Sequence, residues 1–376
     1  MSMTGDSSAG HDSPHFSVRR GGLVPETPRL SICMLVLHDT ALALDCLESL
    51  RRPGACPPDT ELVVVANGTS ADRLAPLMAQ DDVVVVVNEV NLGFAAGCNQ
   101  AASVARAPLL LFLNDDSTVE GGCIGALVSA AAADPAIGAV GSRILWADGT
   151  LQEAGSVLWA DGSGARVGEG LPPGSTAYGE PRDVDYASAN GMLVTRSAWD
   201  AVDGFDERYY PAYFEDVDLC LTLRARGFRI RYEPEARVVH RESQSTTGAF
   251  RGFLLTRNQR LLVEKWGPTL EGFEPRPQKQ AGREFDASVR RAVAAAASRG
   301  PMADVAAAAP DEKWCPPQPA GLAQAADALQ TEYHAYLEQR VAEGDRRVAM
   351  LETYLLGLWG VRFRRWLGGH LARRRT

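Results

Sequence analysis

A short acidic stretch is the first feature of this sequence that could do chemistry. Glu215, Asp216 and Asp218 stand together, and His240 ends the same continuous segment, residues 205–240. The leucine spacing after the acids predicts a helix, whose N-terminus stabilises negative charge through its free N–H groups and its dipole. A carboxylate held there can accept a proton from an attacking hydroxyl group. The stretch therefore predicts half of a catalytic site, with a capped and solvated helix start as the alternative.

A second acidic group follows the apolar run 109–113 and consists of Asn114, Asp115 and Asp116. Two acids and an amide at the tip of a buried strand are poorly placed for stability and well placed for a divalent cation. Mg²⁺ and Mn²⁺ prefer oxygen ligands and leave positions open for substrate phosphates. We expect a Mg²⁺ or Mn²⁺ site here, with a helix N-cap as the alternative.

The elements that position these groups alternate along the first part of the chain. Apolar runs of strand length at 31–37, 62–65, 83–87 and 109–113 are separated by stretches with helical spacing. This alternation predicts an α/β fold with a mostly parallel, Rossmann-like sheet and helices on both faces. Ligands of such sheets bind beyond the C-terminal ends of the strands. The acidic group 114–116 would lie at that edge.

Two glycines stand at a strand-to-helix connection within residues 91–99. Gly93 and Gly97 permit close approach of a ligand at a helix N-terminus, which is a place suited to phosphate. Glycines also serve tight packing between elements, so both interpretations stay open.

Composition limits the class of protein. The chain has 376 residues and a net charge of -9, which argues against nucleic-acid binding. Its seven scattered cysteines indicate reduced thiols, and no apolar run approaches the ~18 residues of a membrane span. We expect a cytoplasmic protein with a disordered leader at 1–28, a main domain at 29–270 and a helical C-terminal extension at 271–376.

The end of the extension, residues 354–376, combines leucine, tryptophan and phenylalanine with six arginines and no acid. Basic and aromatic residues on one helix are typical of an interfacial helix on anionic lipid, which would place the protein on the inner face of the plasma membrane. Docking of this helix on the main domain, or on a second subunit in a homo-oligomer, is the alternative.

Four sequence blocks occur in an order and spacing that resemble a known family. They are NLGFAAGCN at 91–99, LLFLNDD at 110–116, DGTLQEAG at 148–155, and GFDERYYPAYFEDVDLCLTLRARGF at 204–228 followed by VVH. The chain resembles inverting glycosyltransferases of family 2, which have the nucleotide-sugar-binding GT-A fold. The resemblance is strongest to the rhamnosyltransferase and galactofuranosyltransferase branch. It covers about residues 30–268.

The resemblance implies a division of labour within the main domain. A donor-binding half would occupy about 29–120 and an acceptor-binding, catalytic half about 121–270. Asp116 and His240 would ligate the metal, and Asp216 would be the general base. Glu215 would bind the acceptor or orient that base.

The resemblance also implies binding residues for the two substrates. The donor would be a UDP- or dTDP-sugar, and the acceptor a glycan, a lipid-linked saccharide or a secondary metabolite, as in cell-envelope or polysaccharide biosynthesis. Donor binding would fall to Asn67, Asn91, Gly93, Phe94, Asn99, Asn114 and Asp115. Acceptor binding would fall to Tyr209, Tyr210, Tyr213 and Asn190.

The chemistry explains these residue types. A divalent cation neutralises the leaving nucleotide diphosphate, and one carboxylate takes the proton of the acceptor hydroxyl during attack at the anomeric carbon. Attack from the face opposite the leaving group inverts the configuration. We therefore expect a metal-dependent inverting glycosyltransferase.

Two positions depart from the family pattern. Leu37-His38 replaces the usual Tyr-Asn, and Ala66 replaces the acid that usually reads the base of the donor. These changes leave the identity of the base open and motivate an alternative, a nucleotide-sugar-binding pseudoenzyme or scaffold. A nucleotidyltransferase is a third hypothesis, although nothing here resembles its basic phosphate-clamping loop.

Overall fold

The structure is a computed structural model that describes residues 16–37, 40–241, 248–278, 281–299 and 319–342. The chain forms two compact units. The first comprises Met1–Ser243 with Arg260–Trp314, and the second comprises Gln244–Gln259 with Cys315–Thr376. The acidic groups and the histidine singled out in the sequence all belong to the first unit.

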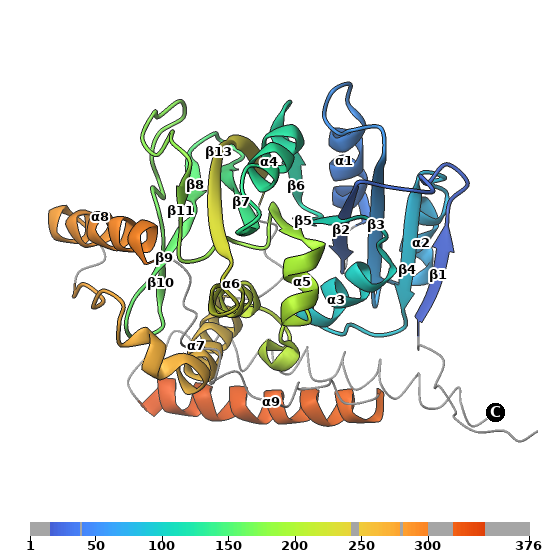
Figure 1. Cartoon of the computed structure of the whole chain (residues 1–376). Helices are drawn as coiled ribbons and strands as arrows, with labels where there is room; N and C mark the ends of the chain where they lie inside the picture. Colours follow the sequence, from blue (N-terminus) through green and yellow to red (C-terminus); the bar gives the residue numbers. More distant parts are fainter. Residues whose placement is uncertain (1–15, 38–39, 242–247, 279–280, 300–318, 343–376) are drawn as a thin grey trace, which may run out of the picture. The chain divides into compact units, whose positions relative to one another are not determined.

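The first unit contains an eleven-stranded sheet with the order β1-β4-β3-β2-β5-β12-β7-β13-β11 (Figure 1). Its central strands β4, β3, β2 and β5 run parallel to one another. They span Val83–Asn88, Thr60–Asn67, Leu30–Val36 and Leu109–Asn114. Their nearly continuous apolar sequences suit strands that are buried on both faces.

The second half of the sheet brings distant parts of the chain together. β12 (Met192–Thr195) runs antiparallel between β5 and β7 (Ile137–Trp146), and β13 (Arg229–His240) runs parallel to β7. The short strands β6 (Ser117–Val119), β8 (Leu151–Ala154) and β11 (Arg182–Asp183) pair with β13, β7 and β13 respectively. A separate pair is formed by β9 (Ser156–Leu158) and β10 (Gly164–Arg166).

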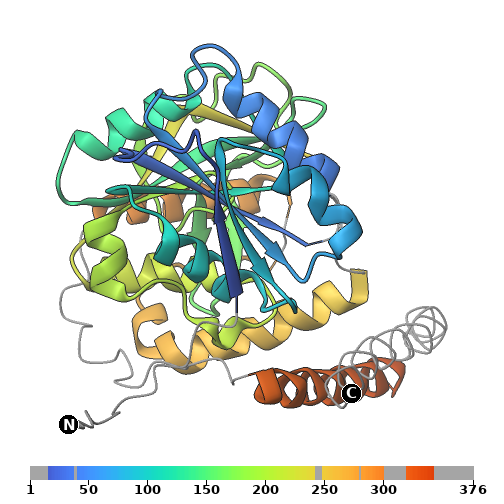
Figure 2. The same ribbon diagram turned by 90° about the vertical axis from the view of Figure 1, so that its right-hand side faces the viewer.

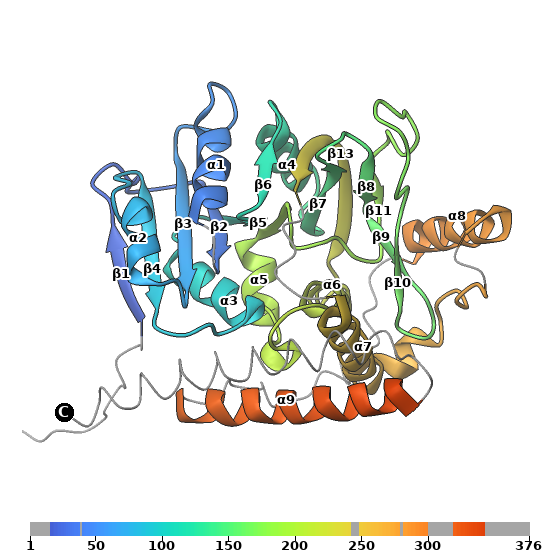
Figure 3. The same ribbon diagram turned by 180° about the vertical axis from the view of Figure 1, so that it is seen from behind.

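Helices cover both faces of the sheet, as Figure 2 and the view from behind in Figure 3 show. One face packs against α3 (Phe94–Val104), α5 (Arg196–Val202) and α6 (Glu215–Ala225). The other packs against α1 (Thr40–Arg51), α2 (Ala71–Met78) and α4 (Cys123–Ala132). The predicted α/β fold, with a central parallel sheet between helices, is confirmed.

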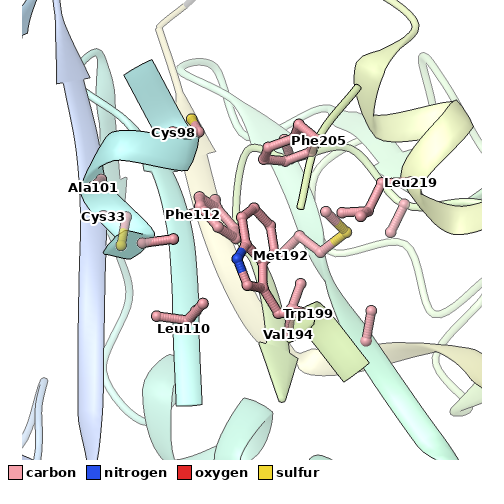
Figure 4. Packing of buried hydrophobic residues seen from close by; sticks show 14 of the residues in the cluster. Cys33, Cys98, Ala101, Leu110, Phe112, Met192, Val194, Trp199, Phe205 and Leu219 are labelled. Atoms are coloured by element: carbon pink, nitrogen blue, oxygen red, sulfur yellow. The ribbon is translucent and has the colours of Figure 1, made fainter. Parts of the chain in front are cut away.

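An aromatic cluster fixes the chain just before the acidic stretch. Phe112 of β5 stacks on Trp199 of α5 with ring centroids 4.8 Å apart, and Phe205 meets both rings edge-on at 5.2 Å (Figure 4). All three side chains are buried. Rings of this size contribute much of the apolar area of a core. The start of segment 205–240 is therefore anchored on the sheet.

The predicted disordered leader is wrong for its last part. Phe16–Arg20 forms β1, which pairs antiparallel with β4 at the edge of the sheet. Arg19 lies 2.9 Å from Asp81, and Arg20 pairs with the buried carboxylate of Glu61. The low apolar content averaged over 1–28 concealed this five-residue strand, which is held by backbone and ionic contacts. Residues 1–15 lie outside the described residues.

Two details of the strands are not visible in the sequence pattern. β13 continues through Pro234 as one strand, with a register shift between Glu233 and Arg237. The stretch 161–180, which is rich in glycine and proline, contains β10.

The main unit also extends beyond residue 270. After α7 (Gly248–Leu270), α8 (Arg283–Ser298) buries Val289 and Ala292 against Val157 and Trp159 of the same unit. An apolar stripe on α8 explains this packing.

The second unit is described over part of its length. Phe250 and Phe253 of α7 pack against Tyr333 and Tyr336 of α9, which spans Pro319–Ala342. Over the described ranges, no helix has the length and apolar character needed to cross a membrane. The basic tail 354–376 lies outside those ranges.

Candidate active site

The two predicted metal ligands lie side by side. Asp116 follows the tip of β5, and His240 ends β13, whose pairing with β6 places His240 opposite Ser117. His240 Nε2 is 3.1 Å from Asp116 Oδ1, and only 13% and 8% of the two side chains are exposed. Sheet pairing therefore joins two groups that lie far apart in the sequence.

This pair fits a divalent cation. His240 Nδ1 is 3.0 Å from Gln152 Oε1. Because an amide oxygen can only accept, Nδ1 carries the proton of this hydrogen bond, and the lone pair of Nε2 is directed at Asp116. Neighbouring ligands of a six-coordinate ion with bonds of about 2.1 Å lie about 3 Å apart, which matches the Nε2 to Oδ1 separation. In the described part of the chain, no group of three or more His, Cys, Asp or Glu side chains is placed to hold a metal ion. Substrate phosphates and water would supply the other ligands.

Asn114 and Asp115 lie at the same strand tip and are both half-buried. The backbone N–H of Asn114 donates to the side-chain oxygen of Asn190, which also accepts a hydrogen bond from Ser117. Asn190 is buried, and these two hydrogen bonds hold the loop that carries Asp116. Its Nδ2 has no hydrogen-bond partner among the described residues, so the acceptor binding suggested by the sequence stays a prediction.

The predicted base lies at the start of α6. Asp216 Oδ2 accepts a hydrogen bond from the N–H of Ala189 at 3.2 Å, and Oδ1 accepts one from the N–H of Val217 at 2.8 Å. Burial raises the pKa of Asp216, and these two N–H groups oppose the rise because they stabilise the carboxylate. The carboxylate is held in a fixed orientation.

Glu215 has a contrasting environment. Its side chain is buried, and its Oε2 has no hydrogen-bond partner among the described residues. Burial raises the pKa of Glu215 well above its usual range, and the adjacent charge of Asp216 raises it further. Of the two neighbouring acids, Asp216 is therefore the one suited to carry the negative charge, which agrees with its predicted role.

The third acid of the stretch has a structural role. Asp218 is 1% exposed and accepts hydrogen bonds from Tyr209 Oη, Lys265 Nζ and Trp266 Nε1 at 3.2, 2.8 and 2.7 Å. Lys265 also reaches Asp206 at 3.1 Å. This network ties the start of α6 to the part of α7 that belongs to the same unit.

The network also corrects one acceptor prediction. Tyr209 is fully buried with its hydroxyl group committed to Asp218, so its ring cannot support an acceptor sugar. Tyr210 packs over Gly93, and Tyr213 is half-buried next to Glu215. An aromatic side chain beside an acid in sequence fits core packing as well as a sugar platform.

Two predicted donor ligands hold the loop between β4 and α3. Asn67 Nδ2 donates to Asn91 Oδ1 and to the carbonyl of Gly93, both at 3.0 Å. Asn67 Oδ1 accepts from Asn88 and from the N–H of Leu92. The polar atoms of Asn67 are thus used within the protein, contrary to its predicted contact with the donor.

Of the two interpretations of the glycines at α3, the structure favours tight packing. The N–H of Phe94 donates to the carbonyl of Pro211 at 2.7 Å. A Cβ atom on Gly93 would lie 2.9 Å from that carbonyl oxygen, and one on Gly97 would lie 2.7 Å from Leu35. Both glycines therefore permit close approach of the protein's own chain.

Asn99 completes this attachment of α3 to the acidic segment. Its Nδ2 donates to the carbonyl of Phe205 and to Glu207 Oε1, and its Oδ1 accepts from the N–H of Phe205. Asn99 is therefore a structural residue and is not available as a donor ligand.

One acid that the sequence reasoning missed is bound to the same peptide segment as Asp216. Glu153 of β8 is 4% exposed, and its Oε1 accepts from the N–H of Ser188, the residue directly before Ala189. Burial raises the pKa of Glu153 to about 7, and the charge of Arg166 on β10 opposes the rise. Glu153 belongs to the block DGTLQEAG, which could have drawn attention to it.

Comparisons with known proteins show which family and fold the chain resembles. The family model described as "Glycosyl transferase family 2" matches residues 31–167. The O-antigen biosynthesis protein RfbC of Myxococcus xanthus is 32% identical over 227 residues, covering 58% of this chain and 18% of that protein. This chain therefore spans less than a fifth of that relative's length.

A second relative is covered more fully. The N-acetylglucosaminyl-diphospho-decaprenol L-rhamnosyltransferase of Mycobacterium tuberculosis H37Rv is 32% identical over 208 residues, covering 49% of this chain and 67% of that protein. The rhamnosyltransferase WbbL of Escherichia coli K12 is 42% identical over 57 residues, covering 15% of this chain and 21% of that protein.

Among solved structures, GalNAc-T7 with UDP, GalNAc and Mn²⁺ has a TM-score of 0.51 at 16% identity. The likeness covers 64% of this chain and 48% of that one. It identifies the GT-A fold. Together with the family match and the 67% coverage of the mycobacterial relative, these findings show that the chain belongs to glycosyltransferase family 2, in its rhamnosyltransferase-like branch.

Proposed function

We propose that this protein transfers a sugar from a nucleotide diphosphate sugar to a hydroxyl group of a glycan or lipid-linked acceptor, with inversion at the anomeric carbon. The observation that carries the proposal is the contrast between Asp216, whose carboxylate is held by two backbone N–H groups, and the buried Glu215 beside it. Such a fixed carboxylate is what a single-base transfer needs.

The relatives suggest the substrates. Because two relatives are named rhamnosyltransferases, we propose a UDP- or dTDP-activated sugar as donor, with dTDP-L-rhamnose as the first to test. The printed name of the mycobacterial relative includes a lipid-linked diphosphate, which supports an acceptor of that class here.

The residues of this chain divide the reaction between them. Asp116 and His240 would hold Mg²⁺ or Mn²⁺, which supplies charge neutralisation for the leaving diphosphate when bound. Asp216 accepts the proton of the attacking hydroxyl group at one carboxylate oxygen. Glu215 stays neutral because of its burial, so the negative charge of the pair concentrates on Asp216.

The substitution Asp216→Asn tests the base. It should lower transfer by about 10²- to 10⁴-fold, the usual contribution of a general base, while the donor still binds. Release of nucleotide from dTDP-L-rhamnose and from UDP-sugars, with Mn²⁺ or with EDTA, measures turnover, and the thermal shift given by each donor measures binding. Asp200→Asn is the matched control, because Asp200 is an exposed acid of the same unit. Equal loss of binding and turnover in Asp216→Asn would make Asp216 a structural residue.

A binding protein without turnover is the second candidate, and Ala66 motivates it. β3 carries alanine where the family usually places the acid that reads the donor base. Such a protein would show a thermal shift with donor and no metal-dependent release of nucleotide from any sugar of the panel.

For the basic tail 354–376 we propose binding to anionic lipid, on the basis of its sequence. A chain that ends at Glu352 should lose sedimentation with vesicles containing anionic lipid and keep its thermal shift with donor. If the shortened chain still sediments but loses a dimer, the tail is an assembly element instead.

A further inference from the structure

One β-hairpin contacts the imidazole of His240 at two places. β7 and β8 form this hairpin, and the N–H of Trp146 donates to the carbonyl of Thr150 at 2.8 Å across its turn. In the register of β7 with β13, Trp146 pairs directly with His240. Their rings are stacked with centroids 6.4 Å apart and an angle of 8° between the planes. The indole therefore fixes the plane of the imidazole, and the edge of the ring is left to another residue.

The second contact of the hairpin is with that edge. Gln152 of β8 is 2% exposed, and its Oε1 lies 3.0 Å from His240 Nδ1. On the other edge of the ring, Nε2 lies 3.1 Å from Asp116 Oδ1. The three side chains form a row that starts on β8, passes β7 to β13, and ends at the strand tip that carries Asp116.

An irregularity in β8 accounts for the direction of Gln152. The register of β8 against β7 shifts between Ile144 and Leu145, and Gln152 is the extra residue. Such a β-bulge re-aims a side chain, and bulges are common next to active sites. Leu151 and Ala154 accordingly pack in the same core cluster although they are three residues apart. The bulge thus releases Gln152 from the regular alternation, so that it can reach the histidine.

The two neighbours of the ring compete for one proton. A neutral imidazole carries its proton on either Nδ1 or Nε2. Gln152 Oε1 accepts it from Nδ1 and Asp116 Oδ1 accepts it from Nε2, so the two hydrogen bonds favour different tautomers. A proton on Nε2 occupies the position at which the ring would bind a cation. The bond to Gln152 therefore keeps this nitrogen available.

We propose that Gln152 is a positioning residue of the metal-binding pair, whose amide oxygen holds the proton of His240 on Nδ1 and so leaves Nε2 free for the cation. The inference rests on the proposed function, in which Asp116 and His240 hold Mg²⁺ or Mn²⁺. The block DGTLQEAG contains Gln152, but neither the resemblance nor the comparisons give this residue a role. Its neutral amide is a weaker acceptor than the carboxylate that accompanies many metal-binding histidines.

The first test locates the proton. The full chain is labelled with ¹⁵N-histidine, freed of metal and studied by NMR at alkaline pH, and the signals of His240 are assigned among the six histidines through their loss in His240→Asn. In the parent protein, Nδ1 should carry the proton. Gln152→Leu removes the acceptor and keeps a side chain of similar size, so the proton should move to Nε2, where Asp116 accepts it. Gln152→Glu should keep it on Nδ1, because a carboxylate can only accept.

Two results of this test would overturn the assignment. A proton on Nε2 in the parent protein would mean that the amide of Gln152 is reversed and donates to Nδ1. An equal share of protonated Nδ1 in the parent and in Gln152→Leu would mean that Gln152 does not select the tautomer. The result for the parent needs no variant at residue 152, so the test stands even if Gln152→Leu does not fold.

The second test measures metal binding. Mn²⁺ alone is titrated into each full-length protein, and the EPR signal of the free ion gives the dissociation constant. Gln152→Leu should weaken binding about 10- to 100-fold, the usual effect of losing the outer partner of a metal ligand, and Gln152→Glu should strengthen it. Unchanged affinity in both variants would overturn the positioning role.

The matched control is the same pair of substitutions at Gln100. This glutamine of α3 is half-buried in the same unit, and its Oε1 also accepts a hydrogen bond, from Asn88 Nδ2 at 2.6 Å. Gln100→Leu and Gln100→Glu should change neither the proton of His240 nor the affinity for Mn²⁺. Effects of equal size at Gln100 would mean that loss of an amide or added charge acts without contact, and would overturn the role of Gln152.

The two tests also separate this inference from the proposed function. The position of the proton is measured without metal or donor, so absence of sugar transfer refutes the proposed function and leaves the role of Gln152 standing. A parent protein that binds Mn²⁺, with variants at residue 152 that bind it equally well, refutes the inference alone.

Discussion

The buried network around Asp218 gives a sharp prediction about stability. In Asp218→Asn, the amide oxygen can still accept from Tyr209 and Trp266, but the amide NH₂ replaces the oxygen that faces Lys265 Nζ at 2.8 Å. Two donors then oppose each other in a site where 2% and 7% of the side chains of residues 218 and 265 are exposed. The ammonium group keeps only Asp206 as a charged partner within this network.

The magnitude follows from burial. Removing one partner of a buried ion pair costs about 3–5 kcal/mol, because the other charge stays away from water. The remaining contact of Lys265 with Asp206 at 3.1 Å places the expected loss near the lower end, about 3 kcal/mol. An exposed pair behaves differently, since water and salt screen it and its contribution is below about 1 kcal/mol.

Urea unfolding of the full chain measures this difference. Asp218→Asn should lower the free energy of unfolding by about 3 kcal/mol. The control Glu264→Gln removes an acid from an ion pair of the same helix that is 61% and 67% exposed, and should change stability by less than about 1 kcal/mol. A loss in Asp218→Asn no larger than that of the control would refute the structural role assigned to Asp218.

Three further predictions concern positions corrected or added by the structure. Gly93→Ala should cost about 2–3 kcal/mol in urea unfolding, because its Cβ meets the carbonyl of Pro211 at a positive φ of 84°, whereas Gly170→Ala, with φ of 79° and open space, should cost only about 1 kcal/mol. Asn67→Ala should lower the free energy of unfolding by about 2 kcal/mol, because it leaves backbone and side-chain groups of the loop unpaired. A loss below about 0.5 kcal/mol, the usual size of effects at surface positions, would contradict this role. Because burial raises the pKa of Glu153 from 4.5 to about 7, its neutral form is favoured on folding and stability is lost as pH rises between these values. Urea unfolding should therefore show Glu153→Gln gaining about 2–3 kcal/mol over the parent at pH 8 relative to pH 4.5, and no pH dependence of the gain would contradict the raised pKa.

The sequence was sufficient to predict the fold and the position of Asp116 at a strand tip. Apolar strands alternating with helices predict the parallel centre of the sheet, and the placement of Asp116 at a strand tip follows from that topology. Its contact with His240 came from the resemblance, since the pairing of β6 with β13 cannot be read from either segment alone.

The roles of individual polar side chains were harder to predict. The side-chain amide of asparagine can hydrogen-bond a ribose or a backbone carbonyl with the same groups. The motif containing Asn91 and Asn99 therefore does not distinguish a donor-binding site from contacts that stabilise a loop. Gly93 is needed for close approach whether the approaching atom belongs to a phosphate or to Pro211. Only the three-dimensional partners decide between these uses.

The positions of Glu153 and Arg166 in the fold could not be predicted from the sequence. Each belongs to a short strand, and neither spacing nor residue type connects the two. Their proximity depends on the turn between β8 and β9 and on the pairing of β9 with β10. A local sequence pattern contains no information on such a contact.

The register shift in β13 determines which face of the sheet His240 occupies. Glu233 pairs with Ser142 and Arg237 with Arg143, so the three residues 234–236 have no counterpart in β7. They act as a spacer between residues 229–233, of which Ile230 and Tyr232 pack in the core, and residues 237–240, which end in His240. Because side chains alternate along a strand, loss of one residue from the spacer, with residues 229–233 kept in register, would move His240 to the opposite face and put Arg241 in its place beside Asp116. The length of this spacer is therefore as strictly constrained as the identity of the histidine.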